Sequence, residues 1–357
     1  MTKYNFYAGP AILPKEVMAE ASKNTLELAD TGLSILEMSH RSKEIADILA
    51  EAKSSVYELF DISPDKYEVL FLQGGASSQF YMSAMNFLGE NEKAAYVDTG
   101  AWSTKALKEA KSFGHAEMIA GSSDKNYNYI PKGYEIPADL KYLHTTSNNT
   151  IFGTQYKEFP ETSVPMICDM SSDIFSRPID FSKFGLIYAG AQKNLGPAGV
   201  VLVILDKEFA AKQSREVPTM LNYQTHVKKD SAFNTPPVFP IYVSMLTMRW
   251  LKKKGGLAAV AKQNEEKAAL LYNEIDRNPL FYGTAEIEDR SLMNVCFLLH
   301  NEDLTEGFLA ACAEANIIGV KGHRSVGGFR ASIYNAMPLE GVQVLVDVMK
   351  TYESKHA

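Results

Sequence analysis

The sequence has 357 residues, of which 46% are hydrophobic and 22% charged, and its formal net charge is -7 at pH 7. A chain of this length and apolar content can bury one large core or two ordinary ones. The acidic balance excludes nonspecific nucleic-acid binding, which needs a basic face.

The strongest apolar run is GVVLVIL at 199–205, far shorter than the roughly 20 residues of a membrane-spanning helix. The first residues, MTKYNFYAGPAILP, contain no apolar segment of the kind found in secretory signals. Cys168, Cys296 and Cys312 are scattered in apolar stretches, which predicts buried, reduced thiols, and the histidines show no metal-ligand spacing. We therefore predict a cytoplasmic protein with no structural metal, no nucleic-acid partner and no membrane partner.

Between about residues 67 and 205, short apolar segments alternate with amphipathic helical ones. Near-continuous apolar strands separated by helices predict an α/β fold with a mostly parallel sheet that is covered on both faces. Ligands of such sheets bind at the carboxyl ends of the strands. The predicted strands are YEVLFL (67–72), AAYVDTG (94–100), VPMICDMSS (164–172), FGLIYAGAQ (184–192) and GVVLVILD (199–206), with helical patterns at 79–88 and 101–114.

The segment LKKKGG at 251–256 marks a predicted domain boundary, because a new amphipathic helix starts after it. A large domain is predicted over 1–254 and a small α+β domain over 255–357, which is a normal domain size. The small domain is predicted to contain a strand at 290–299, a helix at 304–317, a hairpin at 319–337 and a closing helix at 339–353.

Two strand-to-helix junctions carry residues that suit a cofactor. Gly74 and Gly75 precede the helix at 79–88, where free backbone N–H groups and the helix dipole bind phosphate well. An ordinary tight turn is the alternative, and the spacing matches neither a Walker loop nor the dinucleotide fingerprint. Trp102 follows the strand at 94–100, either as a core side chain or as a face that stacks on a ring.

Two further strand ends carry a lysine and a carboxylate. Lys193 follows the strand at 184–192, either as a lysine that extends to solvent or as a desolvated amine that forms a Schiff base. Asp169 ends another apolar run, either as a helix cap or as a carboxylate that faces a cleft. Together with a phosphate cup, this pair matches what pyridoxal phosphate requires: an amine for its aldehyde and a carboxylate for its pyridine nitrogen.

Four motifs carry a resemblance to a known family: AGAQKNLGPAG (189–199), FSRPID (175–180), NTPP (234–237) and HRSVGGFRASIYNAM (323–337). They resemble the phosphoserine aminotransferases, which are class V aminotransferases and pyridoxal-phosphate enzymes of fold type I. The match covers nearly the whole chain, and related aminotransferases and cysteine desulfurases lack HRSVGGFR. The resemblance implies a large domain with a mostly parallel seven-stranded sheet, a smaller C-terminal α+β domain, and a homodimer with active sites at the interface.

The resemblance also implies the contacts of the cofactor. Lys193 is the Schiff-base lysine, Asp169 is the partner of the pyridine nitrogen, and Trp102 stacks on the ring. Ser77 stands where many members carry arginine, so the phosphate loop here supplies no positive charge to the substrate. The remaining contacts, to the phosphate or the phenolic oxygen, are assigned to Ala76, Ser77, Thr150 and Gln192, and to Asn234 and Thr235 of the neighbouring subunit.

The substrate contacts follow from the same resemblance. Arg330 binds the α-carboxylate, and Gly9 contributes a backbone contact, since Ala8 stands where the family often has serine. The implied reaction converts 3-phosphohydroxypyruvate and glutamate into O-phosphoserine and 2-oxoglutarate, in serine biosynthesis. The resemblance also implies action on 3-hydroxy-2-oxo-4-phosphooxybutanoate, in pyridoxine biosynthesis. The distal anion of the substrate is assigned to His40, Arg41, His323 and Arg324.

Three alternatives stay open at the level of the sequence. A serine–glyoxylate or alanine-type transaminase shares the fold, but its substrates lack the second anion that Arg41 and Arg324 would bind. A Schiff-base aldolase on an eightfold barrel would use Lys193 without a cofactor, although strand–helix repeats are scarce after residue 205. A noncatalytic phosphate-binding protein would bind O-phosphoserine without exchanging its α-proton.

Overall fold

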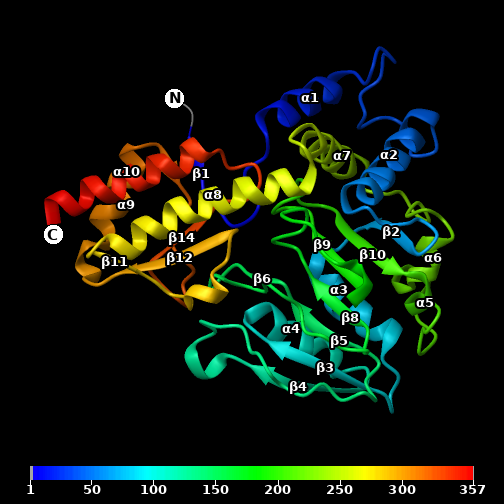
Figure 1. Cartoon of the computed structure of the whole chain (residues 1–357). Coiled ribbons are helices and arrows are strands. Elements are labelled where there is room, and N and C mark those ends of the chain that lie inside the picture. The colour runs from blue at the N-terminus through cyan, green and yellow to red at the C-terminus, as the bar shows by residue number, and fades with distance from the viewer. Residues whose placement is uncertain (1–2, 357) are drawn as a thin grey trace.

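A seven-stranded sheet forms the centre of the larger part of the molecule, in a computed structural model that describes residues 3–356 (Figure 1). Its strand order is β2-β10-β9-β8-β5-β3-β4. Strand β10 is antiparallel to both of its neighbours, and the other pairs are parallel. The predicted α/β fold with a mostly parallel sheet is confirmed. The strands are β2 (Tyr67–Leu72), β3 (Lys93–Asp98), β4 (His115–Gly121), β5 (Leu143–Thr146), β8 (Met166–Asp169), β9 (Phe184–Gly190) and β10 (Val201–Asp206).

Strands β4 and β5 have no counterpart among the predicted strands. Strand β5 lies in the interior of the sheet between β3 and β8, but its sequence, LHTT, is short and half polar. Strand β4 is an edge strand with several exposed residues, so it lacks a continuous apolar run. Neither segment therefore carries the hydrophobic pattern that marks a strand in sequence.

Helices cover both faces of this sheet. Side chains alternate between the faces along β10: Leu202 and Ile204 join one core cluster, whereas Val201, Val203 and Leu205 join the other. The first face is covered by α1 (Lys15–Leu26), α2 (Lys43–Phe60) and α7 (Val238–Lys253), and the second by α3 (Gly75–Phe87), α4 (Ala101–Ala110), α5 (Lys207–Ala210) and α6 (Tyr223–Val227).

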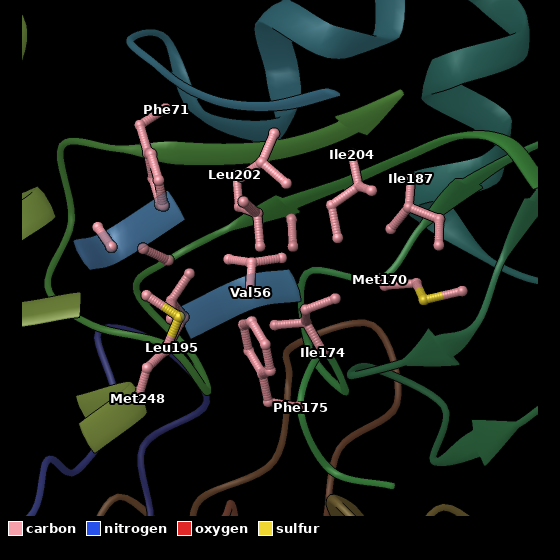
Figure 2. Close-up of a cluster of buried hydrophobic side chains, with 14 of the residues drawn as sticks. Val56, Phe71, Met170, Ile174, Phe175, Ile187, Leu195, Leu202, Ile204 and Met248 are labelled. Carbon is pink, nitrogen blue, oxygen red and sulfur yellow. The ribbon is translucent and has the colours of Figure 1, made fainter. Parts of the chain in front are cut away.

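Figure 2 shows the core of the first face at side-chain level. Phe71 of β2 and Leu202 of β10 point from the sheet toward Val56 of α2 and Met248 of α7. The strands are rich in valine and other β-branched residues, which pack well on a pleated, buried surface. This explains why the apolar runs recognised in the sequence are strands in the structure. This packing fixes the strand ends that carry the candidate site.

Helix α8 (Gly256–Arg277) leads from the large sheet to a second, three-stranded antiparallel sheet with the order β11-β12-β14 (Figure 1). The helix begins after Gly255, whose φ of 96° favours glycine. The predicted domain limits at 254 and 255 stay a prediction. The strands of this sheet are β11 (Phe281–Gly283), β12 (Asn294–Leu299) and β14 (Phe329–Ser332), and its helices are α8, α9 (Thr305–Glu314) and α10 (Leu339–His356).

The start of the chain also lies against this smaller unit, because β1 (Tyr4–Asn5) pairs in parallel with β13 (Ile317–Ile318). The predicted hairpin at 319–337 contains an antiparallel bridge between Lys321 and Phe329, although only β14 is a regular strand there. The remaining elements are β6 (Asn148–Asn149), β7 (Thr154–Gln155) and five short 3-10 helices: Ser123–Lys125, Phe181–Lys183, Thr219–Leu221, Ile287–Asp289 and Glu302–Leu304.

Three further observations concern the sequence predictions. Cys168, Cys296 and Cys312 are buried and form no disulfide, as predicted. None of the helices in the described part of the chain combines the length and the apolarity of a membrane span. The open sheet also excludes the eightfold barrel on which a Schiff-base aldolase would be built.

The core packing yields a stability prediction. Leu202→Ala removes a fully buried side chain between β2, β9 and the helices, so it should lower the free energy of unfolding by about 2–5 kcal/mol. The matched control is Leu26→Ala, because Leu26 is 83% exposed, and it should change stability by less than about 0.5 kcal/mol. Urea unfolding measures both values, and equal losses in the two variants would contradict the assignment of the core.

Candidate active site

The carboxyl ends of four strands meet at one edge of the large sheet. Asp169 is the last residue of β8, and Lys193 lies in the turn that follows β9. Gly74 follows β2, and Trp102 lies in the first turn of α4, directly after β3. Because these strands run in the same direction, the four positions share the edge at which ligands of such sheets bind.

Lys193 is half-buried, and its surroundings favour the neutral amine. Burial lowers the pKa of Lys193 below its ordinary value, Asp169 opposes this shift, and the positive charge of Arg330 adds to it. The Nζ atom lies 5.5 Å from the centre of the Trp102 ring. Gly9 of the N-terminal loop lies over the lysine, since a Cβ atom built on Gly9 would be 3.4 Å from Lys193 Cγ. The loop is held there by the Ala11 N–H, which donates to the Gln192 carbonyl at 2.9 Å.

Asp169 is 6% exposed, and its Oδ1 atom accepts a hydrogen bond from the Ser171 N–H at 2.9 Å. Burial raises the pKa of Asp169, whereas the nearby Lys193 lowers it. A second buried carboxylate, Asp173, accepts hydrogen bonds from Ser147 Oγ and from Gln155 Nε2. The site therefore holds a buried carboxylate near an amine of reduced basicity. The carboxylate suits a cationic ring nitrogen.

Trp102 is held in place through both its indole group and its backbone. Its indole Nε1–H donates to Thr150 Oγ1 at 3.2 Å. The first turn of α4 is anchored by Asp98, which accepts hydrogen bonds from the Ser103 and Thr104 hydroxyls at 2.8 and 2.9 Å. The ring is half-buried, so one part of its surface remains open toward the site. The alternative of a pure core residue does not describe this position.

The Gly74–Gly75 turn has the geometry of a phosphate cup. Both glycines have positive φ, 88° and 62°, and α3 starts directly at Gly75. A Cβ atom on Gly74 would meet Ser78 Oγ at 1.8 Å, so only glycine fits there. Ala76 and Ser77 form the first turn of the helix, where free N–H groups point out of its N-terminus.

Arg330 of β14 reaches this edge from the smaller unit. Its Nη1 atom donates to the Thr150 carbonyl at 2.9 Å, and its buried Nε has no hydrogen-bond partner among the described residues. His323 lies close by, and its pKa is lowered by burial and by the charges of Arg330, Arg324 and Lys105. The surroundings are therefore strongly positive, which suits an anionic ligand.

One cation of this group is absent from the residues predicted from the sequence. Lys105 lies one helical turn after Trp102 on α4, and its Nζ is 4.5 Å from the centre of that ring. Its charge also lowers the pKa of His323. The signal in the sequence is the i, i+3 spacing of Trp102 and Lys105, which puts both side chains on one face of a helix.

Three predicted residues, His40, Arg41 and Asn234, are not brought to this group by contacts within the described part of the chain. His40 lines a cavity of about 470 Å³ together with Asp230, Ser231 and Ala232, and Arg41 is exposed. Asn234 and Thr235 follow that segment and are also exposed, and the Thr235 carbonyl accepts a hydrogen bond from Gln73 Nε2 at 3.0 Å, next to Gly74. The two pairs thus lie near one another on the surface, apart from the contacts made by Lys193.

Comparison with known proteins identifies the family to which the chain belongs. The family model for class V aminotransferases matches residues 3–345. A phosphoserine aminotransferase of Flavobacterium johnsoniae is 61% identical over 355 residues, which are 99% of this chain and 100% of the relative. One of Parabacteroides distasonis is 54% identical over the full length of both chains.

Solved structures extend the similarity to the fold. The phosphoserine aminotransferase from Bacillus circulans subsp. alkalophilus aligns with a TM-score of 0.97 at 47% identity, covering 100% of this chain and 99% of that one. A PLP-bound phosphoserine aminotransferase from Trichomonas vaginalis aligns with a TM-score of 0.93 at 37% identity, covering 98% and 100%. The chain therefore belongs to the class V aminotransferase family, within its group of phosphoserine aminotransferases.

Proposed function

We infer that this chain catalyses the phosphoserine aminotransferase reaction with pyridoxal phosphate as its cofactor. The reaction is reversible and converts 3-phosphohydroxypyruvate and L-glutamate into O-phospho-L-serine and 2-oxoglutarate, a step of serine biosynthesis. The observation that carries this inference is the half-buried Lys193 amine, with its lowered pKa, close to Asp169 in a chain of this family. A noncatalytic phosphate-binding protein has no need of such a lysine.

The residues present fit pyridoxal phosphate. Lys193 offers an amine of reduced basicity, Asp169 a buried carboxylate, and Trp102 an anchored aromatic face. The Gly74–Gly75 turn opens toward free space, since a Cβ atom on Gly75 would have no neighbour within 4 Å. When bound, the cofactor supplies an aldehyde that holds the amino group and a protonated ring that withdraws electrons from it.

We assign the holding of the cofactor to Asp169 at the pyridine nitrogen, Trp102 on the ring, and the first turn of α3 at the phosphate. Ala76, Ser77, Thr150 and Gln192 complete these contacts. Lys193 moves the proton at the α-carbon of the substrate, because a desolvated amine with a lowered pKa is a group that can both accept and return a proton. The N-terminal loop at Gly9 covers the lysine and limits the access of water.

The two anionic groups of the substrate are bound by different cations in this proposal. Arg330 receives the α-carboxylate, since its unpartnered Nε and its guanidinium fork suit bidentate binding. His323, Arg324 and Lys105 receive the distal phosphate or carboxylate. The same pocket suits 3-hydroxy-2-oxo-4-phosphooxybutanoate, which carries both anionic groups on a four-carbon chain.

We further propose that the active enzyme is a homodimer that works in the cytoplasm. Arg41 and Asn234 are exposed and have no contact with Lys193, Asp169 or Trp102 among the described residues, which supports a role for them, together with His40, in the site of the other subunit. Thr235 is exposed as well, and its carbonyl contacts Gln73 of its own chain. Asn234 and Thr235 would reach the cofactor phosphate there. The buried, unpaired cysteines are consistent with a reducing compartment.

The role of Lys193 is tested by Lys193→Ala. The variant should keep its fold but lose most of its turnover. Positioned acid–base catalysis alone supplies about 10²–10⁴-fold, and the loss should be larger because the covalent anchor is removed together with the proton carrier. Lys183→Ala, which alters a lysine paired with Glu161 at the surface, is the control and should keep normal turnover. Steady-state rates with O-phosphoserine decide, and near-normal turnover of Lys193→Ala would refute the assignment.

Substrate selection is tested by Arg324→Ala and Arg330→Ala. A lost charge-assisted hydrogen bond is worth roughly 1.5–3 kcal/mol, or about ten- to a hundredfold in kcat/KM. Arg324→Ala should slow phosphoserine most, glutamate less and alanine hardly at all, because alanine has no distal anion. Arg330→Ala should slow all three equally. Half-reaction rates measure this order, and an equal effect of Arg324→Ala on alanine would show that the distal pocket lies elsewhere.

The shared site is tested by subunit complementation. Arg41→Ala and Lys193→Ala each inactivate their own homodimers in this proposal. Mixed subunits should recover about a quarter of the wild-type activity, since half of the dimers are hybrids and each hybrid holds one intact site. If Arg41 acted within its own chain, no mixed dimer would contain an intact site, and activity would stay at the level of the two parents.

A further inference from the structure

A buried polar network joins the two parts of the molecule beside the active site. Asn294 of β12 is 0% exposed and Asn148 of β6 is 2% exposed, and Asn148 Nδ2 donates to Asn294 Oδ1 at 2.8 Å. The two residues belong to different sheets, so this amide pair connects the smaller unit to the large one. Neither asparagine is among the residues assigned above to the cofactor or the substrate.

Asn294 also holds the strand that carries Arg330. Its Nδ2 group donates to Ser332 Oγ at 2.9 Å and to the Tyr334 hydroxyl at 3.1 Å. Ser332 and Arg330 lie on the same short strand, β14. The Tyr334 hydroxyl in turn donates to the Ala8 carbonyl at 2.7 Å, next to Gly9. Through these two contacts Asn294 fixes both β14 and the N-terminal loop.

Asn148 anchors the other end of the network to the cofactor side of the site. It donates to Ser172 Oγ at 2.8 Å, and Ser172 lies three residues after Asp169. Its Oδ1 atom accepts from Ser291 Oγ at 2.5 Å. Asn148 itself lies two residues before Thr150, which accepts from Trp102 and, through its carbonyl, from Arg330.

Every polar atom of the two side-chain amides has a hydrogen-bond partner. Such a satisfied network specifies one arrangement, because any shift of β14 relative to β6 would leave buried donors and acceptors without partners. Apolar contacts are not directional, so two apolar side chains at this place would specify the arrangement less sharply. The distance between Arg330 and the Lys193 end of the site is thus set by directional bonds.

We propose that Asn294 is a positioning residue of the aminotransferase reaction, which holds Arg330 and the N-terminal loop at the place required by the α-carboxylate of the substrate. This inference rests on the proposed role of Arg330. Asn294 acts through its contacts with Ser332 and Tyr334 and does not touch the substrate. A shift of about 1 Å in such a clamp changes rates by up to about a hundredfold.

The test compares Asn294→Ala with Asn278→Ala in the holoenzyme. Asn278 is a matched control: it is 2% exposed and donates to Glu274, Glu353 and the Met349 carbonyl, and its hydrogen bonds within the described residues do not involve β14 or the N-terminal loop. Asn294→Ala should raise KM for phosphoserine and glutamate by the same factor, about ten- to a hundredfold, with a smaller change in kcat. Inhibition by inorganic phosphate should stay unchanged, because the phosphate carries no α-carboxylate.

Two further measurements separate positioning from stability and from the reaction itself. Hydrogen–deuterium exchange should accelerate at 329–332 and at 4–8 in Asn294→Ala but not in Asn278→Ala. Ser332→Ala breaks the same contact from the other side, so its effect on KM should not add to that of Asn294→Ala in the double variant. This milder substitution also serves if Asn294→Ala folds poorly.

Each outcome decides one point. Equal KM values in the Asn294 and Asn278 variants, additive effects of Asn294 and Ser332, or unchanged exchange at 329–332 would each overturn the positioning role. If wild-type protein fails to react with phosphoserine, the proposed function falls, whereas the exchange comparison still decides whether Asn294 holds β14.

Discussion

The desolvated amine of Lys193 beside the carboxylate of Asp169 is the interaction on which the site depends. Burial acts on both groups in the direction of the neutral form: it lowers the pKa of Lys193 and raises the pKa of Asp169, and the charge of each group opposes the shift of the other. Lys267, which is buried, shows that burial alone does not make a lysine available for Schiff-base chemistry. Burial lowers the pKa of Lys267 to about 7, but its amine is committed to the carbonyls of Ile333 and Tyr334 at 2.9 and 2.7 Å. Among the residues that the structure describes, the Lys193 amine has no such bonds to the backbone, and it lies next to Trp102.

The rest of the fold serves to hold that pair in place. Adjacent parallel strands β8 and β9 fix the backbones that carry Asp169 and Lys193, and cores on both faces of the sheet keep these strands rigid. The smaller unit then supplies Arg330 across a junction of directional hydrogen bonds between Asn148 and Asn294. The strands that carry Asp169 and Lys193 and the strand that carries Arg330, to which we assign the α-carboxylate, thus belong to separate sheets.

The sequence predicted the parts that depend on local pattern. The apolar runs locate the strands, and Asp169, Lys193 and Trp102 are recognisable because they follow those runs. Strand β5 is too short and too polar to be found, although it lies in the sheet interior. Asn294 escapes for a different reason, because its partners are distant in sequence and only the tertiary fold brings them together. Lys105 lies three residues after Trp102, but its proximity to His323 also depends on the tertiary fold. The roles proposed for Arg41 and Asn234 would need a second chain, so contacts within one chain do not test them.

Reduction of the holoenzyme with borohydride, followed by peptide mapping, tests the central claim most directly. The account predicts that the cofactor becomes irreversibly attached to Lys193 alone, since this amine combines reduced basicity with a neighbouring carboxylate. Attachment to Lys267 or Lys105, or release of the whole cofactor unattached, would contradict it.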